Sequence, residues 1–135
     1  MLVDTGVLVG AVNRDDHNHD ACAKLMTTTV GPLIVPDLVV GEACYLVDKY
    51  LGPSIEATFL RSLLLPDIRL EALVAADLTR MAELVERYAD LRLGATDASV
   101  IAAAERLGIT TLATIDRRHF TVVRPNHVEA FELVP

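Results

Sequence analysis

Short apolar runs with strand character alternate with helical periods along most of this chain. The runs MLV (residues 1–3), PLIV (32–35) and TTLATI (110–115) have the length and composition of buried strands. Between the second and third runs, the apolar residues from Val74 to Tyr88 recur at steps of four and three, which predicts an amphipathic helix. Strands that alternate with helices favour an α/β fold with a mostly parallel central sheet flanked by helices.

The remaining elements follow from caps, breakers and apolar faces. Asp37 is a suitable N-cap for a helix that ends at Gly52, and Thr96 is one for a helix that ends at Gly108. The other expected elements are helices over 4–12, from about 16 to 28 and from about 54 to 63, a short strand near 68–73 and a terminal strand within 127–134. The helix from about 54 is expected to have one apolar face, formed by Ile55, Phe59, Leu60 and Leu63.

Length and composition predict one globular domain over residues 1–135, because 52% of the residues are hydrophobic and 23% are charged. Charged residues interrupt each apolar run before the roughly 18 residues of a membrane helix, and Asp4 in the apolar start argues against a signal peptide. Cys22 and Cys44 show no metal or redox spacing, which favours free thiols in a reducing compartment. We therefore expect a cytoplasmic protein that does not associate with membranes.

Four acidic residues are expected to meet at one edge of the sheet. In a parallel sheet with crossover helices, strand C-termini and helix N-termini share an edge, and open α/β sheets bind their ligands there. Asp4 follows the first strand, Asp116 follows TTLATI, and Asp97 lies in the first turn of its helix. Glu42 is about five residues into the helix that begins near Asp37, roughly 6–8 Å from that edge at 1.5 Å per residue.

Each of these acids also has a purely structural interpretation. Asp4 and Asp116 could cap the helices that follow them, and Asp97 could suit a helix dipole. Glu42 is too far into its helix for a cap, and its helical neighbours are mostly apolar, so we expect it to point inward. A buried carboxylate needs a partner. That partner is either an arginine or a cluster of hard cations such as Mg²⁺ or Mn²⁺.

Four blocks of sequence together resemble the PIN-domain ribonucleases, and especially the VapC-type toxins of toxin–antitoxin pairs. They are MLVDTGVLV, VGEACYLV, LGATDASVIAAAERLG and LATIDRRHF, which extend over nearly the whole chain. No block is specific alone, but four in this order in a chain of this size form a specific pattern. The resemblance implies a PIN-like three-layer sandwich in which Asp4, Glu42, Asp97 and Asp116 form an acidic quartet that binds Mg²⁺ or Mn²⁺.

The chemistry that the resemblance implies is metal-dependent endoribonuclease activity, the hydrolysis of RNA phosphodiester bonds by a metal-activated water. Asp97 or Asp116 would also orient the attacking water. Thr5 stands where the family often has a small hydroxyl residue, and Thr114 matches a position that can hydrogen-bond a ligand or water. Gly6 occupies a position often held by serine or another small residue.

RNA, a cognate antitoxin protein and a second copy of the chain are the implied partners. The net charge of −7 argues against a binder that works by overall positive charge, but setting the quartet aside leaves −3. Arg117 and Arg118 follow the last acid, and Arg14 and Arg92 fall in expected loops, so these four are predicted to contact RNA. A solvated basic loop is the alternative for each. The helices from about 16 and 54 are candidates for protein contacts, although most of their apolar residues are expected in the core.

Two alternative functions come from the same residues. A non-catalytic PIN-like module could bind RNA or protein without binding a metal. The DTG at residues 4–6 matches the aspartic-protease signature, but the helical periods at 74–88 and 97–107 contradict that nearly all-β fold.

Two further site types fit poorly. A phosphoryl-transfer domain usually has a second acid two residues after the first, or a lysine at its site. Here position 6 is glycine, and the lysines Lys24 and Lys49 fall in expected helices away from the edge. His17 and His19 in DDHNHD invite a zinc interpretation, but that stretch is more typical of a helix start with acidic capping.

Overall fold

The computed structural model, which describes residues 1–135, is built on a five-stranded sheet. Its strands are β1 (Leu2–Val3), β2 (Leu33–Pro36), β3 (Ile68–Glu71), β4 (Thr111–Ala113) and β5 (Glu132–Val134). They lie in the order β3-β2-β1-β4-β5, and each neighbouring pair is parallel. The expected parallel sheet is therefore confirmed.

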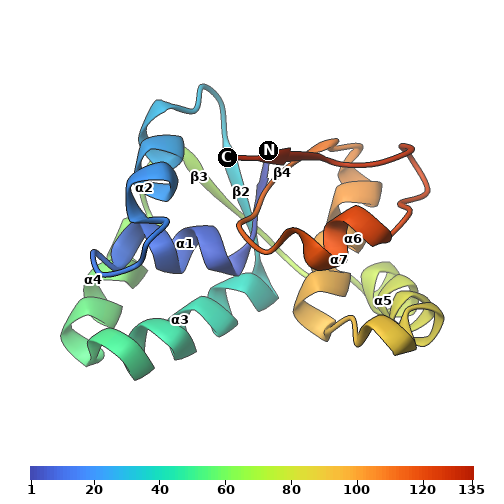
Figure 1. Ribbon diagram of the computed structural model, residues 1–135, viewed down its shortest axis with the longest axis horizontal. Helices are drawn as coiled ribbons and strands as arrows, with labels where there is room; N and C mark the ends of the chain where they lie inside the picture. The colour runs from blue at the N-terminus through green and yellow to red at the C-terminus, as the bar shows by residue number, and fades with distance from the viewer.

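Helices cover both faces of this sheet and give the expected three layers (Figure 1). They are α1 (Thr5–Val12), α2 (His19–Thr28), α3 (Asp37–Leu51), α4 (Pro53–Ser62), α5 (Ala75–Arg87), α6 (Ala95–Leu107) and α7 (Arg117–Val122), with a 3-10 turn η1 (Ala89–Leu91) before α6. In Figure 1, α1 to α4 lie on one side of the strands and α5 to α7 on the other.

The strands are added to the sheet in opposite directions on either side of the point between β1 and β4. It passes from β1 through β2 to β3 on one side, then crosses to β4 and β5 on the other. Right-handed crossovers place the helices of these two halves on opposite faces, which explains the two helical layers. The point between β1 and β4 is a topological switch point, where the carboxyl ends of parallel strands leave room for a ligand.

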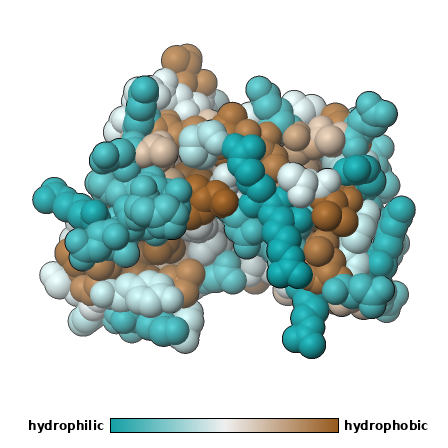
Figure 2. All heavy atoms as spheres, in the orientation of Figure 1, coloured by the Kyte–Doolittle hydropathy of each residue, from teal (hydrophilic) through white to brown (hydrophobic).

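The core is formed by β1, β2, β4 and the middle of α6, together with the buried faces of α1 and α3. Leu2, Val3 and Val35 are fully buried, and every residue of α6 from Ala98 to Ala104 is buried. One apolar cluster extends from Leu2 to Phe131. On the face drawn in Figure 2, apolar atoms also reach the surface at the left, where Figure 1 places α1, α3 and α4.

Two predicted N-caps are wrong, that of α3 by one residue and that of α6 by two. Asp37 is the first residue of α3, and its carboxylate accepts a hydrogen bond from the backbone N–H of Leu73 at 3.2 Å instead of capping its own helix. Thr96 lies inside α6, which begins at Ala95 after an extended Gly94. Glycine is also a favoured residue at that position.

Three other expectations differ in extent. The second helix begins at His19 rather than near 16, because the Asp16 carboxylate accepts from the N–H of Asn18 at 2.8 Å and forms a turn there. The terminal strand is limited to residues 132–134. The short helix α7 was anticipated only through the interpretation of Asp116 as a helix cap, since its six residues are too few to show a period.

The helical layers exclude the aspartic-protease alternative, because that fold is nearly all β. None of the helices has the length and apolar character needed to cross a membrane.

Candidate active site

Asp4 lies at the switch point, where β1 becomes α1. Its backbone N–H donates to the carbonyl of Ala113 at 2.9 Å and so extends the pairing of β1 with β4. One carboxylate oxygen accepts from the N–H of Thr5 at 2.7 Å, which makes Asp4 the N-cap of α1. The other accepts from the hydroxyl of Thr114, beyond the end of β4, at 2.8 Å. Both oxygens of a side chain that is only 5% exposed are thus held by hydrogen bonds.

The electrostatic environment of Asp4 disfavours its ionised form. Burial raises its pKa to about 6, while the hydrogen bonds from Thr114 and Thr5 oppose the rise. The negative charges of Asp97 and Glu42 raise it further. Three of the four predicted acids are therefore close enough to influence one another.

Glu42 reaches this site from α3 but does not point into the core. The hydroxyl of Thr5 donates to its carboxylate at 2.6 Å and links α1 to α3. The buried positions of α3 are Val39, Ala43 and Val47, and Glu42 is exposed on the flank of that face. The inward orientation predicted from the apolar neighbours of Glu42 is wrong, because those neighbours straddle the edge of the buried face.

Asp97 lies in the first turn of α6 and contacts a histidine. Its side chain is 22% exposed, and its carboxylate pairs with Nδ1 of His119, from α7. Burial raises the pKa of Asp97, the contact with His119 opposes that rise, and the charges of Glu42 and Asp116 add to it. The side chain therefore occupies the same negative field as the rest of the quartet.

Asp116 completes the set at the start of α7. It is exposed, and its carboxylate accepts from the N–H of Arg118 at 3.2 Å. The hydroxyl of Thr114 also donates to the backbone carbonyl of Asp116 at 3.2 Å. Asp4 and Asp116 are both N-caps, so the structural interpretation of these residues is true alongside their place in the acidic group.

A close approach of two segments explains the glycine at position 6. A Cβ atom on Gly6 would lie 2.7 Å from Cγ1 of Ile115, nearer than real Cβ atoms come. Ile115 lies between Thr114 and Asp116. The absence of a side chain at Gly6 thus lets the start of α1 pack against the turn that carries two residues of the site.

A hard divalent cation fits these four residues by donor type, since Mg²⁺ and Mn²⁺ prefer carboxylate oxygens. The mutual repulsion among the acids would be relieved by such a charge. No three His, Cys, Asp or Glu side chains already form a metal-binding cluster. Asp4, Glu42 and Asp97 are instead each held by a hydrogen-bond donor of the protein.

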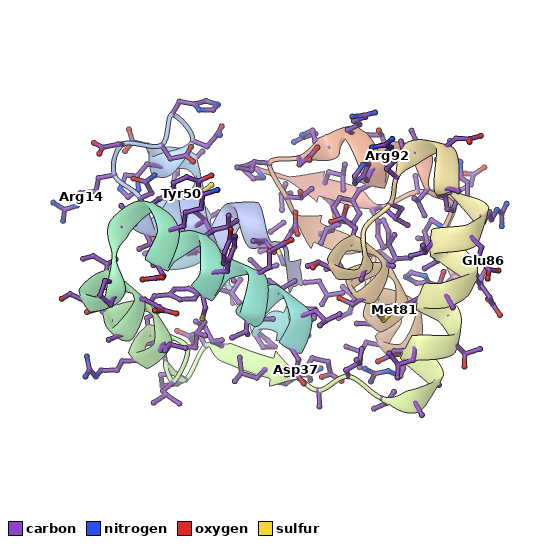
Figure 3. The ribbon with its side chains drawn as sticks, turned by 90° about the horizontal axis from the view of Figure 1, so that it is seen from below. Arg14, Asp37, Tyr50, Met81, Glu86 and Arg92 are labelled. Carbon is purple, nitrogen blue, oxygen red and sulfur yellow. The ribbon has the colours of Figure 1, made fainter.

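The four arginines predicted to contact RNA are spread out. Arg118 is exposed beside Asp116, and its side chain makes no hydrogen bond within the protein, whereas Arg117 donates to the carbonyls of Leu133 and Pro135. Viewed onto the carboxyl ends of the strands, Arg14 and Arg92 lie on opposite sides of the molecule (Figure 3). Arg14 follows the far end of α1, about 12 Å of helix away from Asp4.

The histidines of the chain lie in different surroundings. His19 Nδ1 lies 2.9 Å from the carbonyl of Gly10, and His17 is 91% exposed beside Asp16, so the pair forms no metal cluster. His119, in contrast, touches the site, although the sequence showed it only as part of a basic run after Asp116. No spacing rule links residue 119 to residue 97.

Known proteins match this chain over most or all of its length. A family model described as PIN domain matches residues 1–124. Ribonuclease VapC26 of Mycobacterium tuberculosis is 32% identical over 135 residues, which is 100% of both chains.

Two solved structures share the fold. The crystal structure of Mycobacterium tuberculosis VapC20, described as a Sarcin-Ricin loop cleaving toxin, has a TM-score of 0.77 at 21% identity and covers 82% of this chain and 85% of its own. The crystal structure of FitAcB from Neisseria gonorrhoeae has a TM-score of 0.66 at 19% identity, with coverages of 88% and 89%. At these identities the two structures support the fold alone. With the family match and the full-length relative, the chain belongs to the PIN-domain family, as the four acidic blocks of its sequence predicted.

Proposed function

We propose that this protein, acting as one nuclease domain over residues 1–135, is a Mg²⁺- or Mn²⁺-dependent endoribonuclease. The observation that carries the proposal is the meeting of Asp4, Glu42, Asp97 and Asp116 at the switch point of the sheet, where their charges act on one another. Membership of the PIN-domain family and a full-length relative named as a ribonuclease support RNA as the substrate.

The four acids would hold the cation, and the two threonines would orient two of them. The hydroxyl of Thr114 fixes a carboxylate oxygen of Asp4, and that of Thr5 fixes Glu42. When bound, the cation supplies Lewis acidity for hydrolysis of the phosphodiester. Either Asp97 or Asp116 would orient the attacking water.

Arginines are the proposed contacts with the backbone of an RNA strand. Arg118 is the arginine nearest in sequence to the quartet with a free guanidinium, and Arg117, Arg92 and Arg14 are the other proposed backbone contacts. Bases of RNA are most accessible in single-stranded loops, so a loop of a structured RNA is the proposed target. The cytoplasm is the proposed site of action.

An apolar groove supports the proposed antitoxin partner. A cavity of about 220 Å³ opens between α1, α2 and α4, lined largely by apolar side chains that include Val12, Met26, Phe59 and Leu63. Phe59 on α4 and Leu63 just after it are buried, but Ile55 and Leu60 are 39% and 46% exposed, so not all of the predicted apolar face is core. Grooves of this kind accept amphipathic helices. We propose that the protein is the toxin of a toxin–antitoxin pair and a homodimer.

The direct test is cleavage of total cytosolic RNA by the purified full-length chain with Mg²⁺, with Mn²⁺ and with a chelator. Glu42→Ala removes an exposed acid of the quartet, so it should abolish cleavage while the fold is kept. Asp48→Ala, at an exposed acid six residues further along α3, is the matched control and should cleave normally.

Discrete fragments that depend on the cation and disappear in Glu42→Ala would support the proposal. Cleavage that survives in the chelator, or in Glu42→Ala, would contradict the assignment of the site. No cleavage together with no binding of Mn²⁺ would favour the non-catalytic PIN-like module.

A further inference from the structure

His119 is not one of the four acids, yet its side chain contacts one of them. Its Nδ1 atom pairs with a carboxylate oxygen of Asp97. Both side chains are mostly buried, with exposed fractions of 18% for His119 and 22% for Asp97. The contact is therefore not a loose surface pair.

The fold determines where the His119 ring lies. Asp116 caps α7, and the next residue after His119, Phe120, is 2% exposed and packs edge-on against Phe131 with ring centroids 6.5 Å apart. Val123, just after the helix, is fully buried. These two anchors hold α7 against the core, so its third residue is directed toward the first turn of α6.

The two nitrogens of the ring are in different environments. An ionised carboxylate can only accept hydrogen bonds, so the proton in this contact is on Nδ1 of His119. Nε2 has no partner in the protein and is not a buried atom. The contact with Asp97 thus uses a single defined donor.

We infer that His119 is the positioning residue of Asp97, whose Nδ1–H holds the carboxylate in the orientation needed to ligate the divalent cation. The inference rests on the proposed metal site. Carboxylates that ligate metals are commonly held by a second hydrogen-bonding group, and loss of that group typically lowers metal affinity by about 10- to 100-fold.

Three substitutions separate this role from simple packing. In His119→Asn, the side-chain amide nitrogen is the same number of bonds from the backbone as Nδ1 of histidine. It can therefore donate a hydrogen bond to Asp97. In His119→Gln the amide lies at the distance of Nε2 and cannot take that place. His119→Ala removes the donor altogether. The control is His17→Ala, which removes an exposed histidine outside the site.

The measurement is the affinity of the full-length chain for Mn²⁺ by calorimetric titration, alongside the melting temperature in a chelator. His119→Ala and His119→Gln should bind Mn²⁺ about 10- to 100-fold more weakly, while His119→Asn stays within about threefold of the unaltered protein. His17→Ala should not change the affinity. The melting temperatures identify any variant that fails to fold.

Equal Mn²⁺ affinity in all variants would overturn the inference, and so would an equal loss in His119→Asn and His119→Ala. Absence of Mn²⁺ binding by the unaltered protein would overturn it as well. Normal Mn²⁺ binding without any RNA cleavage would count against the ribonuclease proposal alone, because the affinity series would still decide the role of His119.

Discussion

The hydroxyl of Thr114 donates a 2.8 Å hydrogen bond to the carboxylate of Asp4, across 110 residues of sequence. It joins the residue after β4 to the residue after β1, the two strands on either side of the switch point. Thr114 is fully buried and Asp4 nearly so, so the bond operates where water cannot replace it. The pairing of the two central strands therefore brings these two residues together, and Asp4 depends on that pairing for its orientation.

Thr114→Val should raise the pKa of Asp4 above its present value of about 6. The substitution keeps the side-chain shape but removes a hydrogen bond that lowers this pKa. The pKa can be followed by nuclear magnetic resonance of the Asp4 carboxyl carbon during a pH titration in a chelator. Thr111→Val removes a hydroxyl that donates to Glu132 away from the site and serves as control. An unchanged Asp4 pKa in Thr114→Val would refute the prediction.

Asp4 should make the cation-free protein less stable as pH rises. Its pKa of about 6 in the folded chain lies above 3.8, so the folded state binds this proton more tightly than the unfolded state does. The contribution of Asp4 to stability is then fully present below about pH 4 and is lost as pH rises through 6, a change of about 3 kcal/mol.

Asp4→Asn tests this pH dependence, because it keeps an oxygen that can cap α1 but cannot ionise. Both proteins are unfolded with urea in a chelator at pH values from 4.5 to 7.5. The free energy of unfolding of the variant should increase relative to that of the unaltered protein as pH rises. A constant difference in unfolding free energy over this range would exclude the effect. Comparing the two proteins at each pH cancels the titration of their other groups.

Arg118→Glu should weaken RNA binding and flatten its salt dependence. Loss of one phosphate contact to a single strand reduces the slope of log affinity against log salt by about 0.7. Fluorescence anisotropy with a labelled RNA in a chelator gives both quantities. The control is Arg61→Glu, which makes the same charge change in the last turn of α4. The chain runs from that turn to the start of β3, at the edge of the sheet opposite the acids. Equal effects of the two substitutions would show that overall charge, not a contact by Arg118, is responsible.

Arg106→Met should destabilise the fold by about 3 kcal/mol, because it leaves Asp77, which is 3% exposed, without its ionic partner. Burial alone would raise the pKa of Asp77, but hydrogen bonds from Arg106 and from the N–H of Val74 outweigh it and lower the pKa. Arg69→Met removes an exposed partner of Glu71 and should cost less than about 1 kcal/mol. Urea unfolding at pH 7 measures both, and similar losses would contradict the distinction.

The architecture could be predicted because its signals are local. The strands around Leu2, Ile34 and Leu112 are short apolar runs. Their parallel direction follows from the helices between them. The signals that failed are those of single residues at helix ends. Whether Thr96 or Gly94 precedes α6 depends on backbone angles, for which both residues are suitable.

The site was predictable in position but not in detail. An acid directly after a strand, such as Asp4 or Asp116, is placed by the topology of a parallel sheet. The exposure of Glu42 depends on how α3 is rotated about its axis, which apolar neighbours indicate only to within part of a turn. The contact between His119 and Asp97 follows from the packing of Phe120 on Phe131, which no pattern in the sequence encodes.

The two ends of α6 are stabilised in different ways. Arg106 in its last turn pairs with Asp77 and Glu71, and Glu105 accepts two hydrogen bonds from Arg80 of α5. Asp97 lies nine residues before Arg106, about 13 Å along the helix axis. There its carboxylate is repelled by the charges of Glu42 and Asp116. Substitutions near Asp97 can therefore alter the candidate site while the far end keeps the helix in place. The ion pairs that anchor α6 are thus confined to one end of the helix, so a substitution at the acidic end leaves those pairs intact.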